Sequence, residues 1–144
     1  MMINNPVMLK EGAFRELSEG EGVLIGSKCP KCELICFPKM AVCPSCFEVL
    51  PEDNVEIGKQ GQIDAFAVSY VAPEGFQAPY VQAYVKLKEG PRIFSLLDLD
   101  ITSIPHLYKG MEVRLRIKVI GKDVDGRNII GWAYQPIMGD EGNG

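Results

Sequence analysis

Five cysteines lie between residues 29 and 46, and four of them have the spacing of a metal site. Cys29, Cys32, Cys43 and Cys46 form the pattern Cys-x2-Cys-x10-Cys-x2-Cys. Each Cys-x2-Cys pair can direct two thiolates at one ion, and two pairs complete a tetrahedral S4 site. Four thiolates leave no open position, so the predicted site is structural. Zinc is favoured, and iron in a rubredoxin-type site is the alternative.

The residues that follow each cysteine pair depart from the usual pattern of such metal knuckles. The position after the second cysteine favours glycine where its φ is positive, but Glu33 and Phe47 occupy it here. We expect both residues to adopt positive φ at a cost of about 1 kcal/mol or more each. Metal binding can offset that cost.

Cys36, the fifth cysteine, falls outside the metal-site spacing. It lies between two apolar residues, so we favour a small buried side chain over a redox or nucleophilic thiol. Disulfides are not expected, because the sequence predicts a reducing, cytoplasmic location. The first residues lack the basic and apolar regions of a signal peptide, and no stretch is apolar for long enough to span a membrane.

The elements that position the cysteines begin with a predicted helix. Residues 10–20 have an amphipathic pattern in which Phe14 and Leu17 are three residues apart on one face. Residues 23–27 predict a short strand that leads into the first cysteine pair. A polar break then ends a predicted N-terminal unit that spans residues 1–54.

A second unit, residues 55–138, is predicted to consist of strands. Alternating apolar and polar residues place them at 62–71, 81–88, 92–99, 111–119 and 129–134. Five short strands with one longer connection predict a small closed barrel of the OB-fold type. The predicted fold class is therefore mostly β: an N-terminal short helix and four-cysteine zinc ribbon, followed by a five-stranded OB-fold barrel. Residues 139–144 are predicted to form a disordered tail.

The charge distribution argues against a protein that grips nucleic acid by electrostatics. The chain has 144 residues and a net charge of −4. Residues 1–54 contain 5 basic and 8 acidic residues (net −3), and residues 55–144 contain 10 basic and 11 acidic residues (net −1). Neither half is basic, so we expect no nucleic-acid partner. A single-stranded nucleic-acid-binding OB-fold remains the alternative, since such barrels bind bases on exposed aromatic side chains.

The sequence predicts no catalytic residues. It contains a single histidine, His106, and has no nucleophile elbow, P-loop or dinucleotide-binding glycine pattern. Asp98 and Asp100 share one strand face, which is more typical of a solvated strand end than of an acid–base pair.

Several segments together resemble the DUF35 family of rubredoxin-like zinc-ribbon and OB-fold proteins. They are residues 26–32, 37–38, 42–46, 78–81, 89–92 and 134–136. The resemblance extends over about residues 10–137. The missing glycines after Cys32 and Cys46 and the additional Cys36 depart from the family pattern.

The resemblance implies a non-catalytic accessory subunit of a thiolase-type complex that acts on acyl-CoA thioesters. A thiolase-like partner in a hetero-oligomer would supply the nucleophilic cysteine. This chain would bind one structural zinc and help to form or stabilise the CoA-substrate site. A small S4-iron electron carrier is a further alternative.

Two sets of residues are candidates for these contacts. The partner interface is expected at Phe14 and Leu17 of the predicted helix and at Phe76 and Tyr80 of a loop bounded by proline and glycine, because exposed aromatic residues anchor interfaces. The CoA phosphates, bound jointly with the partner, are expected to face three lysines, chosen on charge alone. These are Lys28, Lys31 and Lys39.

Overall fold

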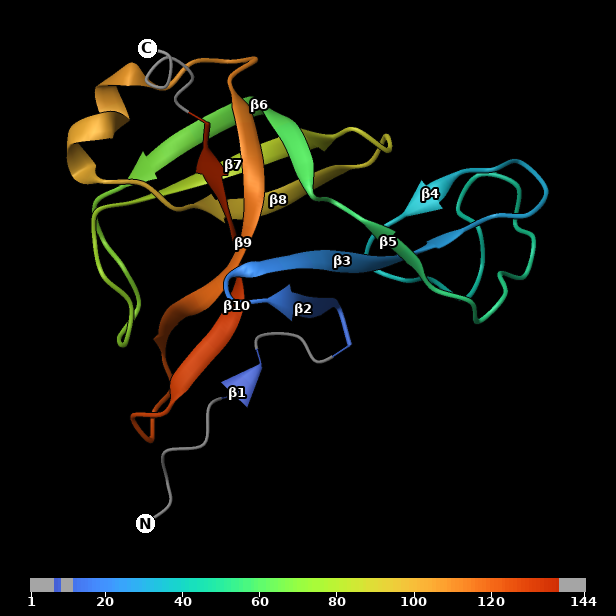
Figure 1. The fold of residues 1–144 in the computed structure, drawn as a ribbon, viewed down its shortest axis with the longest axis horizontal. Helices are drawn as coiled ribbons and strands as arrows, with labels where there is room; N and C mark the ends of the chain where they lie inside the picture. The colour runs from blue at the N-terminus through green and yellow to red at the C-terminus, as the bar shows by residue number, and fades with distance from the viewer. Residues whose placement is uncertain (1–6, 9–11, 138–144) are drawn as a thin grey trace.

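Ten strands and one short helix make up the part of the chain that the computed structural model describes, residues 7–8 and 12–137 (Figure 1). The larger sheet contains β1 (Val7–Met8), β6 (Gln60–Ser69), β7 (Tyr80–Leu87), β8 (Arg92–Leu97), β9 (Glu112–Lys122) and β10 (Asn128–Pro136). The smaller sheet contains β2 (Phe14–Ser18), β3 (Glu21–Lys28), β4 (Ile35–Cys36) and β5 (Val55–Ile57). A 3₁₀ helix, η1 (Ile101–His106), connects β8 to β9. No helix in these ranges has the length and apolar character needed to cross a membrane.

Five strands of the larger sheet close into a barrel. β6, β7 and β8 are neighbours and run antiparallel in succession, and β9 pairs antiparallel with both β6 and β10. The ring closes where β10 pairs with β8 in parallel, with Ala133 opposite Leu96. This arrangement confirms the predicted mostly-β fold with a closed, OB-like barrel. The predicted tail, residues 139–144, lies outside the described residues.

Side-chain alternation fills the barrel interior as predicted. On β7, four alternate residues point inward and are at most 2% exposed: Val81, Ala83, Val85 and Leu87. On β9 the same alternation buries Val113, Leu115 and Ile117, but Val119 is 43% exposed. The alternation of burial ends there, and β9 continues to Lys122 in its hairpin with β10.

The predicted helix over residues 10–20 is wrong. Residues 14–18 form β2, which pairs antiparallel with β3 in a hairpin. Gly20 lies in the hairpin turn with φ +76°, a conformation that costs glycine little. Phe14 is buried and Leu17 is 46% exposed, and the pairing with β3 is irregular between Glu16 and Ser18, at Leu17. One apolar pair three residues apart therefore does not specify a helix, and cross-strand pairing with β3 makes this segment a strand.

The segment between the two cysteine pairs packs on the barrel core through Ile35 and Phe37, whereas Cys29 and Cys43 form a separate small cluster with Leu50. The Trp132 ring, on β10, lies edge-on to Phe14 and Phe37, with ring centroids 5.6 Å and 5.7 Å away. β3 joins the two parts, since it pairs with β2 and β5 beside the barrel and with β4 in the cysteine segment (Figure 1). The ribbon is therefore held against the barrel by packing as well as by chain connectivity.

A buried hydrogen bond fixes the entry into the barrel. Tyr134 is fully buried, and its hydroxyl donates to the backbone oxygen of Gly58 at 2.6 Å. Gly58 has φ +86°, and a Cβ there would lie 2.9 Å from both the Tyr134 hydroxyl and a methyl group of Leu24. Burial raises the pKa of Tyr134, so its hydroxyl remains a donor at neutral pH.

Replacing Tyr134 should show how much its hydrogen bond to Gly58 contributes to the free energy of unfolding. Tyr134→Phe leaves the Gly58 carbonyl buried without its partner, and we expect the free energy of unfolding to fall by about 1–2 kcal/mol. Urea unfolding followed by circular dichroism checks this value. The matched control is Tyr108→Phe at a 58% exposed tyrosine, which should change stability by less than about 0.5 kcal/mol. Equal effects of the two variants would contradict the assignment.

Candidate functional site

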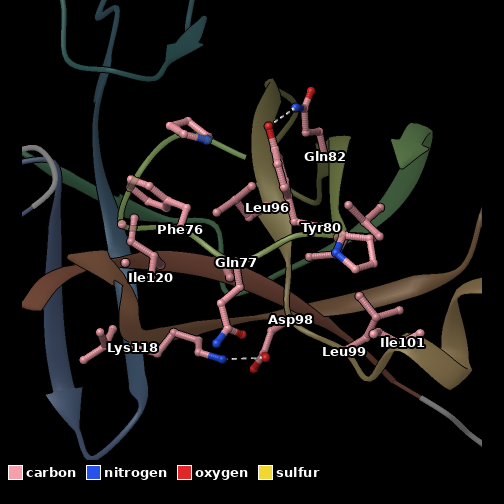
Figure 2. A pocket seen from close by; sticks show the side chains of 18 of the residues that line it. Phe76, Gln77, Tyr80, Gln82, Leu96, Asp98, Leu99, Ile101, Lys118 and Ile120 are labelled. Atoms are coloured by element: carbon pink, nitrogen blue, oxygen red, sulfur yellow. Dashed lines mark hydrogen bonds and ion pairs between the residues drawn. The ribbon is translucent and has the colours of Figure 1, made fainter. Parts of the chain in front are cut away.

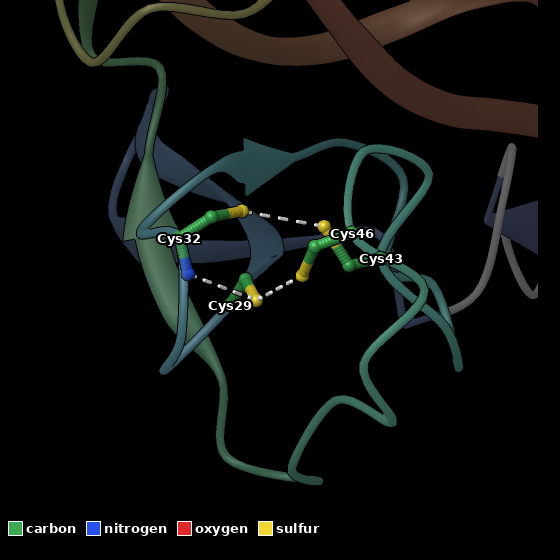
Figure 3. Close-up of side chains that lie close together, drawn as sticks. All are labelled: Cys29, Cys32, Cys43 and Cys46. Atoms are coloured by element: carbon green, nitrogen blue, oxygen red, sulfur yellow. Dashed lines mark hydrogen bonds between the residues drawn. The ribbon is translucent and has the colours of Figure 1, made fainter.

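Four sulfur atoms gather where the two cysteine pairs face each other (Figure 3). The Sγ atoms of Cys29 and Cys46 are 3.5 Å apart, and those of Cys32 and Cys43 are 3.6 Å apart. All four lie within 4.8 Å of one another. A zinc ion with Zn–S bonds of about 2.3 Å separates neighbouring sulfurs in a tetrahedron by about 3.8 Å. The sulfurs therefore already occupy the corners of a site of the right size.

Each cysteine pair forms the same knuckle. The closing backbone hydrogen bonds, each 2.9 Å, run from Glu33 N to Cys29 O and from Cys29 N to Leu34 O in the first knuckle, and from Phe47 N to Cys43 O and from Cys43 N to Glu48 O in the second. Glu33 and Phe47 have φ values of 67° and 65°, which confirms the expected positive φ at both positions. The two knuckles are therefore equivalent in backbone geometry.

Backbone N–H groups point at the sulfurs and set their acidity. The N–H of Cys32 lowers the pKa of Cys29 to about 6, and that of Cys46 lowers the pKa of Cys43. The N–H of Glu48 also lowers the pKa of Cys46, but burial and the neighbouring sulfurs raise it more, to about 12. Four thiolates this close repel one another, and a divalent cation between them removes that repulsion. The donor set therefore fits a thiophilic ion such as zinc.

Cys36 lies outside this cluster. It is on β4, opposite Ser27 of β3, and is 7% exposed. Burial raises the pKa of its thiol. The residue has the buried environment that its apolar neighbours predicted, and this burial disfavours the thiolate form.

The three candidate CoA lysines are all exposed. Lys28 ends β3 and Lys31 lies in the first knuckle. Lys39 already donates hydrogen bonds to the backbone oxygen of Glu52 at 2.8 Å and to Asn54 Oδ1 at 2.7 Å. Lys28 and Lys31 therefore have the more available ammonium groups.

The candidate interface residues have different environments. Phe14 is 6% exposed because its ring packs on Trp132, whereas Leu17 is 46% exposed. Phe76 and Tyr80 are half-buried and line a groove on the barrel surface. Phe14 therefore differs from the three other candidates: its ring packs inside the chain, whereas theirs are at least partly exposed.

The barrel groove is a feature that our sequence reasoning missed (Figure 2). It has a volume of about 600 Å³ and lies between the β6–β7 loop, β8, η1 and β9. Asp98, predicted to be a solvated strand end, forms an ion pair here with Lys118 at 2.6 Å. One signal was present: Leu96 is apolar although it alternates with the inward-facing Ser95 and Leu97. An apolar residue on the outer face indicated that this face is covered or occupied.

Comparison with known proteins agrees with this architecture. Residues 19–49 match the family model described as the ChsH2 rubredoxin-like zinc ribbon domain, and residues 54–118 match the ChsH2 C-terminal OB-fold domain. A solved structure described as an Ltp2-ChsH2(DUF35) aldolase is similar, with a TM-score of 0.61 and 27% sequence identity. The similarity covers 79% of this chain and 84% of that chain.

Two curated relatives match most of the chain. A benzoylsuccinyl-CoA thiolase subunit, BbsA, from Thauera aromatica is 30% identical over 119 residues, covering 79% of this chain and 76% of the relative. A DUF35 domain-containing scaffold protein from Methanocaldococcus jannaschii is 33% identical over 118 residues, covering 79% of this chain and 82% of the relative. Because the two family models match the ribbon and the barrel, and the DUF35 domain-containing scaffold protein matches most of the chain, the chain belongs to the DUF35 family.

Proposed function

We propose that this chain is a non-catalytic, zinc-binding accessory subunit of a thiolase-type complex that acts on acyl-CoA thioesters. The observation that carries the proposal is the similarity to a thiolase subunit along 79% of this chain. A relative named as a scaffold protein supports the same role.

The chemistry of the cysteines supports a structural role for this subunit. Thiolytic or condensing chemistry needs a thiolate nucleophile and an acid–base group beside it. Here Cys29, Cys32, Cys43 and Cys46 would all be bound to zinc, with no open position for a substrate. The remaining thiol, Cys36, is buried and has a raised pKa. The partner would therefore supply the catalytic groups, and the zinc would stabilise the ribbon.

We propose that CoA contacts the ribbon side of the molecule. Lys28 and Lys31 carry exposed ammonium groups near the first knuckle, and Lys39 lies farther along the same segment. In the complex these charges would face the CoA phosphates together with residues of the partner.

The second knuckle offers a further contact for the partner. Phe47 and Val49 are 76% and 75% exposed. Phe47 also adopts positive φ, where glycine costs less. An exposed aromatic side chain at a strained backbone position supports a binding role, since aromatic residues anchor interfaces. Phe47 thus joins Leu17, Phe76 and Tyr80 as a proposed partner contact.

Metal analysis tests the zinc site. The wild-type chain should contain one zinc, and Cys43→Ser should lose it and unfold the ribbon, because metal affinity and ribbon folding are coupled. Cys36→Ala is the matched control and should keep the full zinc content. Inductively coupled plasma analysis measures both. A preparation that contains mainly iron, with visible absorbance, would favour the electron-carrier alternative.

Co-expression tests the partner. The chain and the thiolase encoded nearest to it should elute together at micromolar concentration in size-exclusion chromatography, and the thiolase should lose activity without this chain. Separate elution, with a thiolase that is fully active alone, would contradict the proposal.

Phe47→Gly separates strain from binding. The substitution should leave the ribbon as stable or more stable, by up to about 1 kcal/mol, yet weaken the thiolase complex by about tenfold or more, as loss of an anchor does. The matched control is Val124→Ser at a fully exposed hairpin residue, which should leave the complex unchanged. Unfolding curves and affinity measurements on both variants provide the check. An unchanged affinity in Phe47→Gly would remove the residue from the interface.

One observation favours the nucleic-acid alternative. Tyr84 and Phe94 are exposed on β7 and β8 and lie edge-to-face, 5.3 Å apart. However, the Arg92 guanidinium lies 4.0 Å from the Tyr84 ring centroid and pairs with Asp64 at 2.6 Å, so these groups already have partners. We expect no binding of single-stranded DNA or RNA tighter than the nonspecific range of about 10⁻⁴–10⁻⁶ M at physiological salt. Fluorescence anisotropy at two salt concentrations measures the affinity. A tight complex with a steep salt dependence would favour nucleic-acid binding over the accessory role.

A further inference from the structure

The second half of β6 has a strand partner on one side only. Residues 60–62 pair with β9, and the next residue, Ile63, still donates to Met111 O at 2.9 Å and accepts from Gly110 N at 2.7 Å. A bulge at Asp64 then shifts the register, and β6 changes direction (Figure 1). Beyond this point, no strand in the described part of the chain pairs with β6 on the side opposite β7. Residues 65–69 therefore have a free side, which we call the β6 edge.

The β6 edge lacks the usual protection of an exposed strand. In antiparallel pairing, alternate residues direct their N–H and C=O groups away from the strand they pair with, so part of this backbone faces away from β7. Proteins usually protect such edges with charged side chains, proline or a covering segment. Here the sequence has no charge from Ala65 to Pro73, and Ala65, Phe66 and Ala67 are exposed. An edge of this kind indicates pairing with an extended strand of another chain.

One aromatic side chain shows which face of the sheet is incomplete here. Phe66 lies opposite Ala83 of β7, and Val68 lies opposite Val81. Opposite residues in an antiparallel pair share a face, so Phe66 and Val68 are on the inner face. Val81 and Ala83 are at most 2% exposed, whereas Phe66 is 38% exposed. A strand added to the β6 edge would place a side chain beside Phe66 on this face and cover it.

The β6 edge of a second copy has the properties that such a strand needs. Antiparallel pairing about a two-fold axis at Ala67 places Ala67 opposite its own copy and Phe66 of each copy opposite Val68 of the other. Pairs of an aromatic and a β-branched residue stabilise sheets, and the small side chain at the axis avoids a clash. The pairing uses the free edge of both copies, so the assembly closes as a dimer.

Charge favours this occupant over a charged segment of another protein. The nearest charged side chain in the sequence, Asp64, is already paired with Arg92 at 2.6 Å. An acidic or basic strand would therefore find no free counter-charge along residues 65–69, whereas two uncharged edges meet without repulsion.

We propose that the β6 edges of two copies pair antiparallel and make this chain a weak homodimer. The proposal is independent of the accessory role and of the metal. Five paired residues bury less than the roughly 1,200–2,000 Å² of a stable interface. The dissociation constant should therefore lie in the range of about 10–100 μM.

Sedimentation equilibrium of the full-length, zinc-loaded chain tests the dimer. The wild type should have close to the monomer mass at about 1 μM and close to twice that mass at about 500 μM. Amide hydrogen exchange at the same two concentrations locates the contact. Exchange of the amides in residues 65–69 should slow at the higher concentration.

Opposite charges at the two-fold axis make the test specific. Ala67→Lys and Ala67→Glu each place like charges opposite each other and should weaken self-association by about tenfold or more. An equimolar mixture of the two variants brings opposite charges together and should restore the dimer mass. Ala67 is exposed, so folding should persist, and unfolding midpoints verify it. The control, Val124→Lys at the fully exposed hairpin residue, should associate like the wild type.

Each outcome supports or overturns the dimer. A wild type that stays monomeric at about 500 μM, or a dimer that both Ala67 variants leave intact, would overturn it. A monomeric wild type whose thiolase complex is lost in Ala67→Lys would make the β6 edge a contact for that partner, which also overturns the proposal. Recovery of the dimer only in the mixed variants would support pairing at Ala67, whether or not the thiolase binds.

Discussion

The packing of Trp132 against Phe14 and Phe37 is the interaction on which the arrangement of the molecule depends. These three rings come from the last barrel strand, the first hairpin and the cysteine segment, which are far apart in the chain. Edge-to-face aromatic contacts add roughly 0.5–1.5 kcal/mol each beyond the burial of apolar area. Without them, the ribbon would be attached to the barrel mainly through β3 and its pairing with β5. These contacts hold the segment between the two cysteine pairs, and with it the metal site, against the barrel.

The features that sequence reasoning predicted correctly are those encoded by short-range patterns. The spacing of Cys29 and Cys32 is fixed by the knuckle itself, and the alternation from Val81 to Leu87 follows from the two-residue period of a strand. The positive φ of Phe47 was also predictable, because both knuckles close with the same backbone hydrogen bonds. In each case the residues that decide the geometry are only a few positions apart.

The features that sequence reasoning missed depend on contacts between separate segments, whether the two strands of one hairpin or strands far apart in the chain. Phe14 and Leu17 fit a helix when taken alone, and only pairing with β3 makes them part of a strand. The groove depends on the register that places Leu96 opposite Ala133, and on the close approach of Phe76 to Gly121. Those relations join residues separated by tens of positions, and the pattern of any single segment does not contain them.

The parallel pairing of β10 with β8 has a consequence for the order of folding. The metal ribbon uses contacts between residues less than 20 positions apart, whereas the barrel remains open until residues 128–136 are in place. Contacts of long sequence separation form slowly because a large loop must close first. During synthesis on the ribosome, the N-terminal part can bind its metal while β8 still has an unpaired edge, and such edges promote aggregation. Early metal binding would give the growing chain one ordered part during the interval in which the barrel is most exposed to misassembly.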